Sequence, residues 1–235
     1  MVRKTLSLLA FFTMIAFARV ASAGPIIYDN GAPNLAGGNP SDFNIANQAG
    51  DDFTLSAGAD VIAGIHWWGG YEEFMVGDNL PDGDDGFTIR IYEIDQFNVP
   101  EVNPTVLDLN VGHVGRVDTG DSAASSFSPF EYSIYEYSVD ITPIQLISDT
   151  SYMLSIVNNT PNDEDSWFWT TSDGNGTSWL RTIDGNLWGE LTGADYAFNL
   201  TGPAAVPEPA TLLLMGLGLA GLGFARWRRL NAYRY

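Results

Sequence analysis

Short runs in which apolar and polar residues alternate constrain the fold of this chain most. In residues 87–92, phenylalanine and two isoleucines fall on one face of an extended strand, opposite threonine, arginine and tyrosine, because successive side chains of a strand point to opposite faces. Further β-rich runs lie at residues 61–68, 132–139, 152–157, 167–170 and 196–200. Residues 24–201 contain no helical stripe of ten residues or more, so we predict an all-β fold.

Turn-forming dipeptides separate these runs. Aspartate or asparagine precedes glycine at residues 82–83, 85–86, 173–174, 175–176 and 184–185, and such pairs tolerate the positive φ of tight hairpins. There is no internal repeat of the kind that builds propellers or solenoids, and no linker-like break. We therefore predict one antiparallel β-sandwich, jelly-roll-like, over residues 24–201.

The N-terminus has the three parts of a secretory leader. Arg3 and Lys4 precede an apolar run at residues 6–18, and the small residues Ala21-Ser22-Ala23 come soon after it. A membrane anchor is the alternative, but the run is shorter than the roughly 17–25 residues that a spanning helix needs, and Arg19 ends it. We predict a signal peptide over residues 1–23, cut by signal peptidase before Gly24.

Charge and cysteine content exclude several classes of function. Between Gly24 and Pro209, three arginines face 29 acidic residues without a lysine, which gives a net charge near −26. Nucleic acid is therefore excluded as a partner, because phosphate contacts need clustered cations. The chain has no cysteine, so it forms no disulfide and offers no thiol nucleophile, and its stability must come from its core.

The C-terminus changes composition abruptly. A linker at residues 202–209 ends in Pro207-Glu208-Pro209, and residues 210–227 then form an apolar stretch just long enough to span a membrane. The basic residues at its end and beyond it, including Arg226, Arg228 and Arg229, favour the cytoplasmic side. A buried core helix is the alternative, but the apolar residues cover every face of the segment.

This order of Pro-Glu-Pro, apolar helix and arginine cluster resembles the PEP-CTERM sorting signal of Gram-negative bacteria. The resemblance implies recognition at Pro207, Glu208 and Pro209 by an exosortase, a basic stop at Arg226, Arg228 and Arg229, and an organism that makes a polysaccharide or biofilm matrix. The predicted protein is exported through the inner membrane, anchored transiently by residues 210–227, and delivered to the cell surface or beyond. Residues 228–235 form its basic cytoplasmic tail.

Four segments resemble a passenger domain that recurs ahead of this signal, a similarity that implies a secreted β-sandwich and assigns no catalytic residue. They are Tyr28–Gly31, Asp51–Leu55, Ile65–Tyr71 and Ser155–Asn158.

The sequence contains few features that indicate an enzyme. His66 and His113 are the only histidines, and no nucleophile elbow or metalloprotease helix accompanies them. We expect a non-catalytic matrix or biofilm protein without a catalytic residue. The alternative is an exported carbohydrate-active enzyme that uses a carboxylate pair, since a glycosidase needs little more.

Two kinds of ligand site remain. Aromatic rings stack on sugars, and Trp67, Trp68, Trp167 and Trp169 are the candidate residues for contact with an extracellular polysaccharide, although the same rings could simply build the core. Calcium takes oxygen ligands, and it is the one cofactor that the sequence suggests. Its candidate ligands are Asp78, Asp82, Asp84 and Asp85, which crowd one loop without the spacing of a calcium-binding motif.

Overall fold

A computed structural model describes residues 24–72, 84–126, 128–160, 166–182 and 184–204. These residues form strands and turns without a helix, so none of them belongs to a helix that could cross a membrane. The predicted signal peptide and the C-terminal sorting segment lie outside the described residues. The strands are β1 (Ile26–Asp29), β2 (Gly38–Pro40), β3 (Gln48–Thr54), β4 (Val61–Glu72), β5 (Asp84–Glu93), β6 (Leu107–Ser125), β7 (Ser128–Gln145), β8 (Ser151–Asn158), β9 (Ser166–Ser172), β10 (Thr177–Arg181), β11 (Gly189–Thr192), β12 (Asp195–Tyr196) and β13 (Phe198–Thr201).

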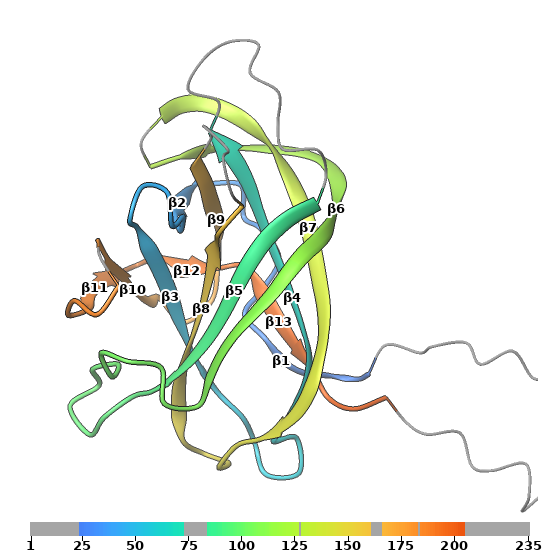
Figure 1. The fold of residues 1–235 in the computed structure, drawn as a ribbon, viewed down its shortest axis with the longest axis vertical. Helices are drawn as coiled ribbons and strands as arrows, with labels where there is room; N and C mark the ends of the chain where they lie inside the picture. Colours follow the sequence, from blue (N-terminus) through green and yellow to red (C-terminus); the bar gives the residue numbers. More distant parts are fainter. Residues whose placement is uncertain (1–23, 73–83, 127, 161–165, 183, 205–235) are drawn as a thin grey trace, which may run out of the picture.

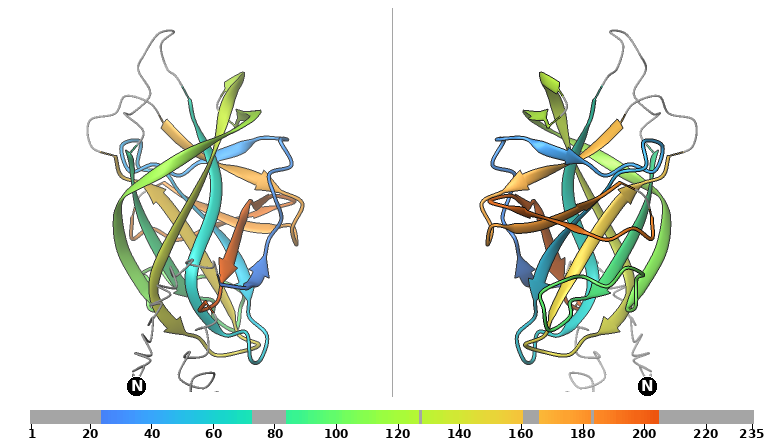
Figure 2. Two further views of the ribbon diagram at one scale, coloured as in Figure 1. Left: turned by 90° about the vertical axis from the view of Figure 1, so that its right-hand side faces the viewer. Right: turned by 90° about the vertical axis from the view of Figure 1, so that its left-hand side faces the viewer.

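One continuous antiparallel sheet supplies both layers of the domain (Figures 1 and 2). Its strand order is β1-β13-β4-β7-β6-β5-β8-β3-β10-β11, with β9 also paired to β4 and with β2 and β12 paired to β9. The sheet curls because β6 changes partner along its length: residues 107–115 pair with β5 and residues 116–125 with β7. The all-β prediction is confirmed, but two separate jelly-roll sheets are not what the pairing shows.

A bulge in β6 explains part of this curl. The register against β5 shifts between Phe87 and Thr88, whose partners are Gly112 and Asn110, so Val111 is the extra residue. Gly112 has a φ of 67°, a conformation that glycine adopts without a Cβ clash. Bulges bend a strand and increase its twist, which turns β6 from one layer toward the other.

The predicted turns are correct where the structure describes a connection. Residues 173–176 join β9 to β10 and residues 184–185 lie between β10 and β11, with positive φ at Gly176 and Gly185. The turn predicted at Asp85-Gly86 is wrong, since both residues lie inside β5. Gly86 is held in the strand by its N–H, which donates to Thr160 Oγ1 over 2.9 Å.

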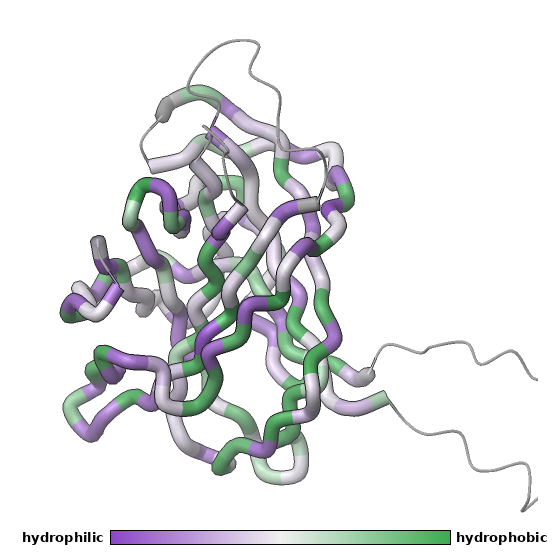
Figure 3. Tube along the Cα trace, viewed as in Figure 1, coloured by the Kyte–Doolittle hydropathy of each residue, from purple (hydrophilic) through white to green (hydrophobic). Residues whose placement is uncertain are grey.

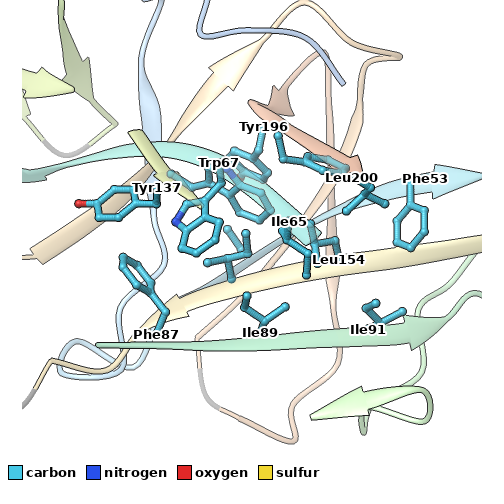
Figure 4. Close-up of a cluster of buried hydrophobic side chains, with 14 of the residues drawn as sticks. Phe53, Ile65, Trp67, Phe87, Ile89, Ile91, Tyr137, Leu154, Tyr196 and Leu200 are labelled. Carbon is cyan, nitrogen blue, oxygen red and sulfur yellow. The ribbon is translucent and has the colours of Figure 1, made fainter. Parts of the chain in front are cut away.

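Aromatic and branched side chains fill the space between the layers (Figure 4). The hydropathy of the chain alternates along the strands that face this space, as Figure 3 shows. Trp67 stacks on Tyr137 with ring centroids 5.6 Å apart, and Trp169 stacks on Tyr196 at 4.9 Å. Such offset ring pairs add to the stabilisation from area burial, which suits a domain without disulfides.

The chain enters and leaves the domain at one place. Strand β1 pairs with β13, so that Ile26 lies opposite Thr201, and the N–H of Gly202 donates to the carbonyl of Pro25 over 2.8 Å. Figure 1 shows both ends of the described chain at the same end of the molecule. The segment after residue 204 therefore starts beside the mature N-terminus predicted at Gly24.

Candidate functional site

The tryptophans predicted to contact polysaccharide are mostly in the core. Trp67, Trp167 and Trp169 are fully buried, so they present no ring face to a sugar, and the hypothesis fails for these three. Side chains alternate between the two faces of a strand, and the curl of the sheet encloses the faces that carry these three rings. Trp68 points outward instead and is half-buried on the outer face of β4, packed against His66 with ring centroids 4.3 Å apart.

The residues predicted to bind calcium do not all lie in a loop. Asp78 and Asp82 lie outside the described residues, and Asp84 begins β5. Asp85 is fully buried, where its carboxylate contacts Arg116 Nη1 at 3.3 Å and accepts a hydrogen bond from the Tyr137 hydroxyl at 2.8 Å. Its charge is already matched, so we withdraw it as a calcium ligand. No group of three or more His, Cys, Asp or Glu residues in the described ranges is placed to hold a metal ion.

An exposed aromatic residue that the sequence did not single out projects from the loop between β2 and β3. Phe43 is 64% exposed, and its N–H donates to the carbonyl of Asn158 in β8 over 2.9 Å. The neighbouring Asp42 is fully buried and accepts from the N–H groups of Trp167 and Asn44, each at 2.8 Å. These bonds fix the loop to the sheet, so the Phe43 ring is presented on a rigid support.

A cavity of about 290 Å³ lies beside this ring on the outer face of β5 and β8. Its lining consists of Phe43, Thr88, Arg90, Val157 and Asn159. Asn159 donates from Nδ2 to Thr88 Oγ1 at 3.0 Å, and its Oδ1 has no hydrogen-bond donor among the described residues. The volume is near the lower end of the roughly 300–1,000 Å³ that small-molecule pockets occupy. We call this cavity the Phe43 pocket.

Arg90 lines the Phe43 pocket and has donors that are unused among the described residues. Its Nε donates to Asp108 at 3.0 Å and its Nη2 contacts Asp184 at 3.1 Å, while the side chain is 14% exposed. The Nη1 group has no acceptor within the described part of the chain, so its two N–H donors are available to a ligand. Asp108 and Asp184 fix the guanidinium and offset its charge. An aromatic residue, an arginine and an asparagine thus line one small cavity.

Two carboxyl groups elsewhere in the domain are buried with no cationic partner among the described residues. Asp51 is fully buried and accepts from the Asn30 side chain and the Tyr196 N–H, while its Oδ1 has no partner in the described residues. Burial raises the pKa of Asp51 well above its ordinary value, and also raises that of Asp195. Asp195 accepts from the N–H groups of Gly176 and Thr177, so both carboxyls position backbone turns.

Comparison with known proteins identifies the C-terminal segment. The family model of the PEP-CTERM protein-sorting motif matches residues 205–229. The chain carries a PEP-CTERM sorting motif. This confirms the predicted resemblance and places the β-rich domain upstream of the motif. The motif implies that the protein is exported and processed by an exosortase.

Other comparisons add little to this PEP-CTERM assignment. No curated protein matches the chain. One similar solved structure contains the cysteine protease and lectin-like domains of Cwp84, a surface layer associated protein of Clostridium difficile, at 10% sequence identity and a TM-score of 0.42. The similarity covers 67% of this chain and 32% of the other, so this chain spans about a third of that protein's length.

The PEP-CTERM motif comes almost directly after the folded domain. Strand β13 ends at Thr201 and the motif match begins at residue 205. The residues between them span roughly 10–14 Å when extended, at about 3.3–3.6 Å per residue. The end of the domain formed by β1 and β13 is therefore the end nearest to the sorting segment, and the Phe43 pocket lies on the outer face of other strands.

One buried carboxyl group, that of Glu72, is expected to make the stability of the domain depend on pH. Glu72 is 3% exposed with its Oε1 unpaired in the described residues, and burial raises its pKa from 4.5 to about 7. The folded state thus holds this proton more tightly, so stability falls as pH rises between about 4.5 and 7. Glu72→Gln is expected to stabilise the domain at pH 8 by about 1–3 kcal/mol relative to the parent.

The measurement for Glu72 is urea unfolding at pH 4.5, 6 and 8. At pH 4.5 the parent and the variant should differ little, because the carboxyl is then largely protonated in the folded state and the amide is its nearest mimic. An equal difference at all three pH values would show that Glu72 does not titrate in this window.

Proposed function

We propose that the exported domain is a non-catalytic, polysaccharide-binding component of the cell surface or extracellular matrix, and that the Phe43 pocket binds one sugar unit. The observation that carries this proposal is the exposed Phe43 ring on a loop that is bonded to the sheet, beside a cavity that Arg90 and Asn159 also line. Among the described residues, Arg90 Nη1 and Asn159 Oδ1 have no hydrogen-bond partner. Sugar rings have an apolar C–H face and a hydroxyl rim. An aromatic face with adjacent donors and acceptors matches both.

The lining of the Phe43 pocket supports binding over hydrolysis. A glycosidase needs two carboxyl groups roughly 5–10 Å apart on either side of the bond that it cleaves. None of the described residues that line this cavity is an aspartate or a glutamate. The exported carbohydrate-active enzyme stays an alternative without an observation in its favour at this site.

The charge of the domain favours neutral over acidic polysaccharides as ligands. Three arginines against 29 acidic residues give a net charge near −26 between Gly24 and Pro209, and a field of this sign repels polyanions at moderate ionic strength. In the Phe43 pocket, Asp108 and Asp184 offset the single cation, Arg90. We therefore assign a neutral polysaccharide as the ligand, in preference to an acidic one.

Phe43→Ala is expected to weaken binding by about 0.5–1.5 kcal/mol, or roughly twofold to twelvefold in Kd, through loss of ring packing. The measurement is a glycan array and then titration calorimetry with the neutral oligosaccharide that binds most tightly. Phe97→Ala is the matched control, because Phe97 is 75% exposed in another loop and lines no part of the pocket.

Two results would refute this assignment. One is equal affinity of the Phe43→Ala and Phe97→Ala variants. The other is binding that favours acidic oligosaccharides such as alginate fragments and weakens steeply with salt.

A further inference from the structure

The outer face of the opposite layer carries a second cluster of aromatic and polar groups. His66 in β4 is bonded on both sides: its Nε2 lies 2.7 Å from Glu136 Oε1 in β7, and its Nδ1 lies 3.2 Å from Asn199 Nδ2 in β13. Since an amide N–H can only donate, Nδ1 accepts and Nε2 carries the proton toward Glu136. The imidazole is thereby fixed against Trp68. We call Trp68, His66 and Glu136 the Trp68 cluster.

Groups in the Trp68 cluster remain available to a ligand. The indole is half-buried, and the Glu136 side chain is 42% exposed. The Oε2 of Glu136 has no donor among the described residues, while Oε1 is engaged by His66. Ser138 is exposed beside them and lies opposite His66 in the ladder. A partly exposed indole with a carboxylate and a hydroxyl nearby offers ring contact and hydrogen bonds to sugar hydroxyls.

The Trp68 cluster and the Phe43 pocket face away from each other. In β4, Trp67 points into the core and Trp68 therefore points out. In β5, Ile89 and Ile91 point into the same core and Arg90 points out. Figure 4 shows Trp67 with Ile89 and Ile91 inside the shared interior. The outward side chains of the two strands thus lie on opposite surfaces of the domain.

We infer that the Trp68 cluster is a second contact site for neutral polysaccharide, so that one domain bridges two polymer chains. This inference rests on the proposed function of the Phe43 pocket. A polymer repeats its binding unit, so two sites on opposite surfaces engage separate chains or distant parts of one chain. The net charge of the domain disfavours nucleic acid and acidic polymers at the Trp68 cluster as well. A protein that links chains in this way would stiffen an extracellular matrix.

The test compares the full chain in detergent with its Phe43→Ala, Trp68→Ala and double variants, against soluble β-glucan, mannan and galactan. Pull-down measures binding and light scattering measures bridging, and size-exclusion chromatography reports the oligomeric state. Glu136→Ala is a second probe of the cluster, since Glu136 is partly exposed and its removal leaves the Trp68 ring in place. Phe97→Ala is the control.

For at least one polymer, the parent and Phe97→Ala should bind and bridge. Each single-site variant should still bind while light scattering falls at least fivefold, and the double variant should lose binding. Bridging that survives in both Trp68→Ala and Glu136→Ala would overturn the second site and leave the Phe43 proposal intact. A parent dimer that Trp68→Ala dissociates would also overturn it, since the cluster would then join two copies of the chain. Absence of binding by the parent to every polymer would refute both.

Discussion

Arg181→Met is expected to lower the free energy of unfolding by about 3–5 kcal/mol, because it removes one member of a buried polar network. The Arg181 side chain is fully buried. It donates to Gln48 Oε1 at 2.6 Å, the Tyr92 hydroxyl at 2.9 Å and the carbonyl of Val102 at 2.7 Å. Its guanidinium also lies 4.2 Å from the ring centroid of Trp188. Methionine fills much of the space but removes the donor to these acceptors, of which the Tyr92 hydroxyl keeps a bond from Gln48 Nε2.

The effect of Arg181→Met is measured by guanidinium unfolding monitored by tryptophan fluorescence. Thr182→Met is the matched control, because Thr182 is the next residue and is exposed; it should change stability by no more than about 0.5 kcal/mol. A loss below about 1 kcal/mol for Arg181→Met would mean that the network does not hold β10 and β11 to the sheet.

The second large effect concerns processing. Replacing Pro207 and Pro209 by alanine is expected to slow removal of the C-terminal segment at least tenfold and to leave an uncut, membrane-bound precursor. Each proline restricts its own φ and biases the preceding residue away from helix, so we expect the tripeptide around Glu208 to be extended. An extended segment suits a protease cleft, whereas alanine would let the helix predicted at residues 210–227 grow toward Ala204.

Processing is monitored by loss of a C-terminal tag in a host that has the sorting enzyme. Pro203→Ala is the control, because Pro203 precedes the motif match at residues 205–229 and is exposed. It should be processed at the parental rate. If the double variant were cut as fast as the parent, Pro207 and Pro209 would have no role in recognition.

Period-two patterns predicted much of the sheet. Residues 61–68, 87–92, 132–139, 152–157 and 167–170 all lie within strands of the structure. These runs are rich in β-branched and aromatic residues. Residues 152–157 and 167–170 are buried on both faces of their strands. The predicted strand at 196–200 is two strands, β12 and β13, which Ala197 separates.

The strands that the sequence did not predict share a weaker pattern. Strand β6 runs from Leu107 to Ser125 with mostly exposed or half-buried residues and several glycines, so its pairing comes from its neighbours β5 and β7. Strands β1, β2 and β11 have three or four residues each. Such short segments give too few positions for an alternation to stand out.

The candidate site could not be predicted from the sequence, because it depends on residues that are distant along the chain. Phe43 stands between polar residues in a loop, and its importance arises only because Asp42 fixes that loop to β9 and the Phe43 N–H bonds it to β8. Arg90 and Asn159 are 69 positions apart in the sequence, and they line the same cavity because β5 pairs with β8. A spacing pattern cannot show this arrangement, since the register of the two strands depends on the whole sheet.

The sequence by itself determined the sorting motif and the all-β class, because both depend on short-range order along the chain: a Pro-Glu-Pro before an apolar segment, and alternation with a period of two. Only the tertiary structure decided which aromatic rings are buried and which are exposed. Trp67 and Trp68 are adjacent in sequence, yet one is in the core and the other faces outward, while Phe43 is more exposed than any of the tryptophans in the domain. Curling of the sheet sets that outcome, because it determines which face of each strand is enclosed.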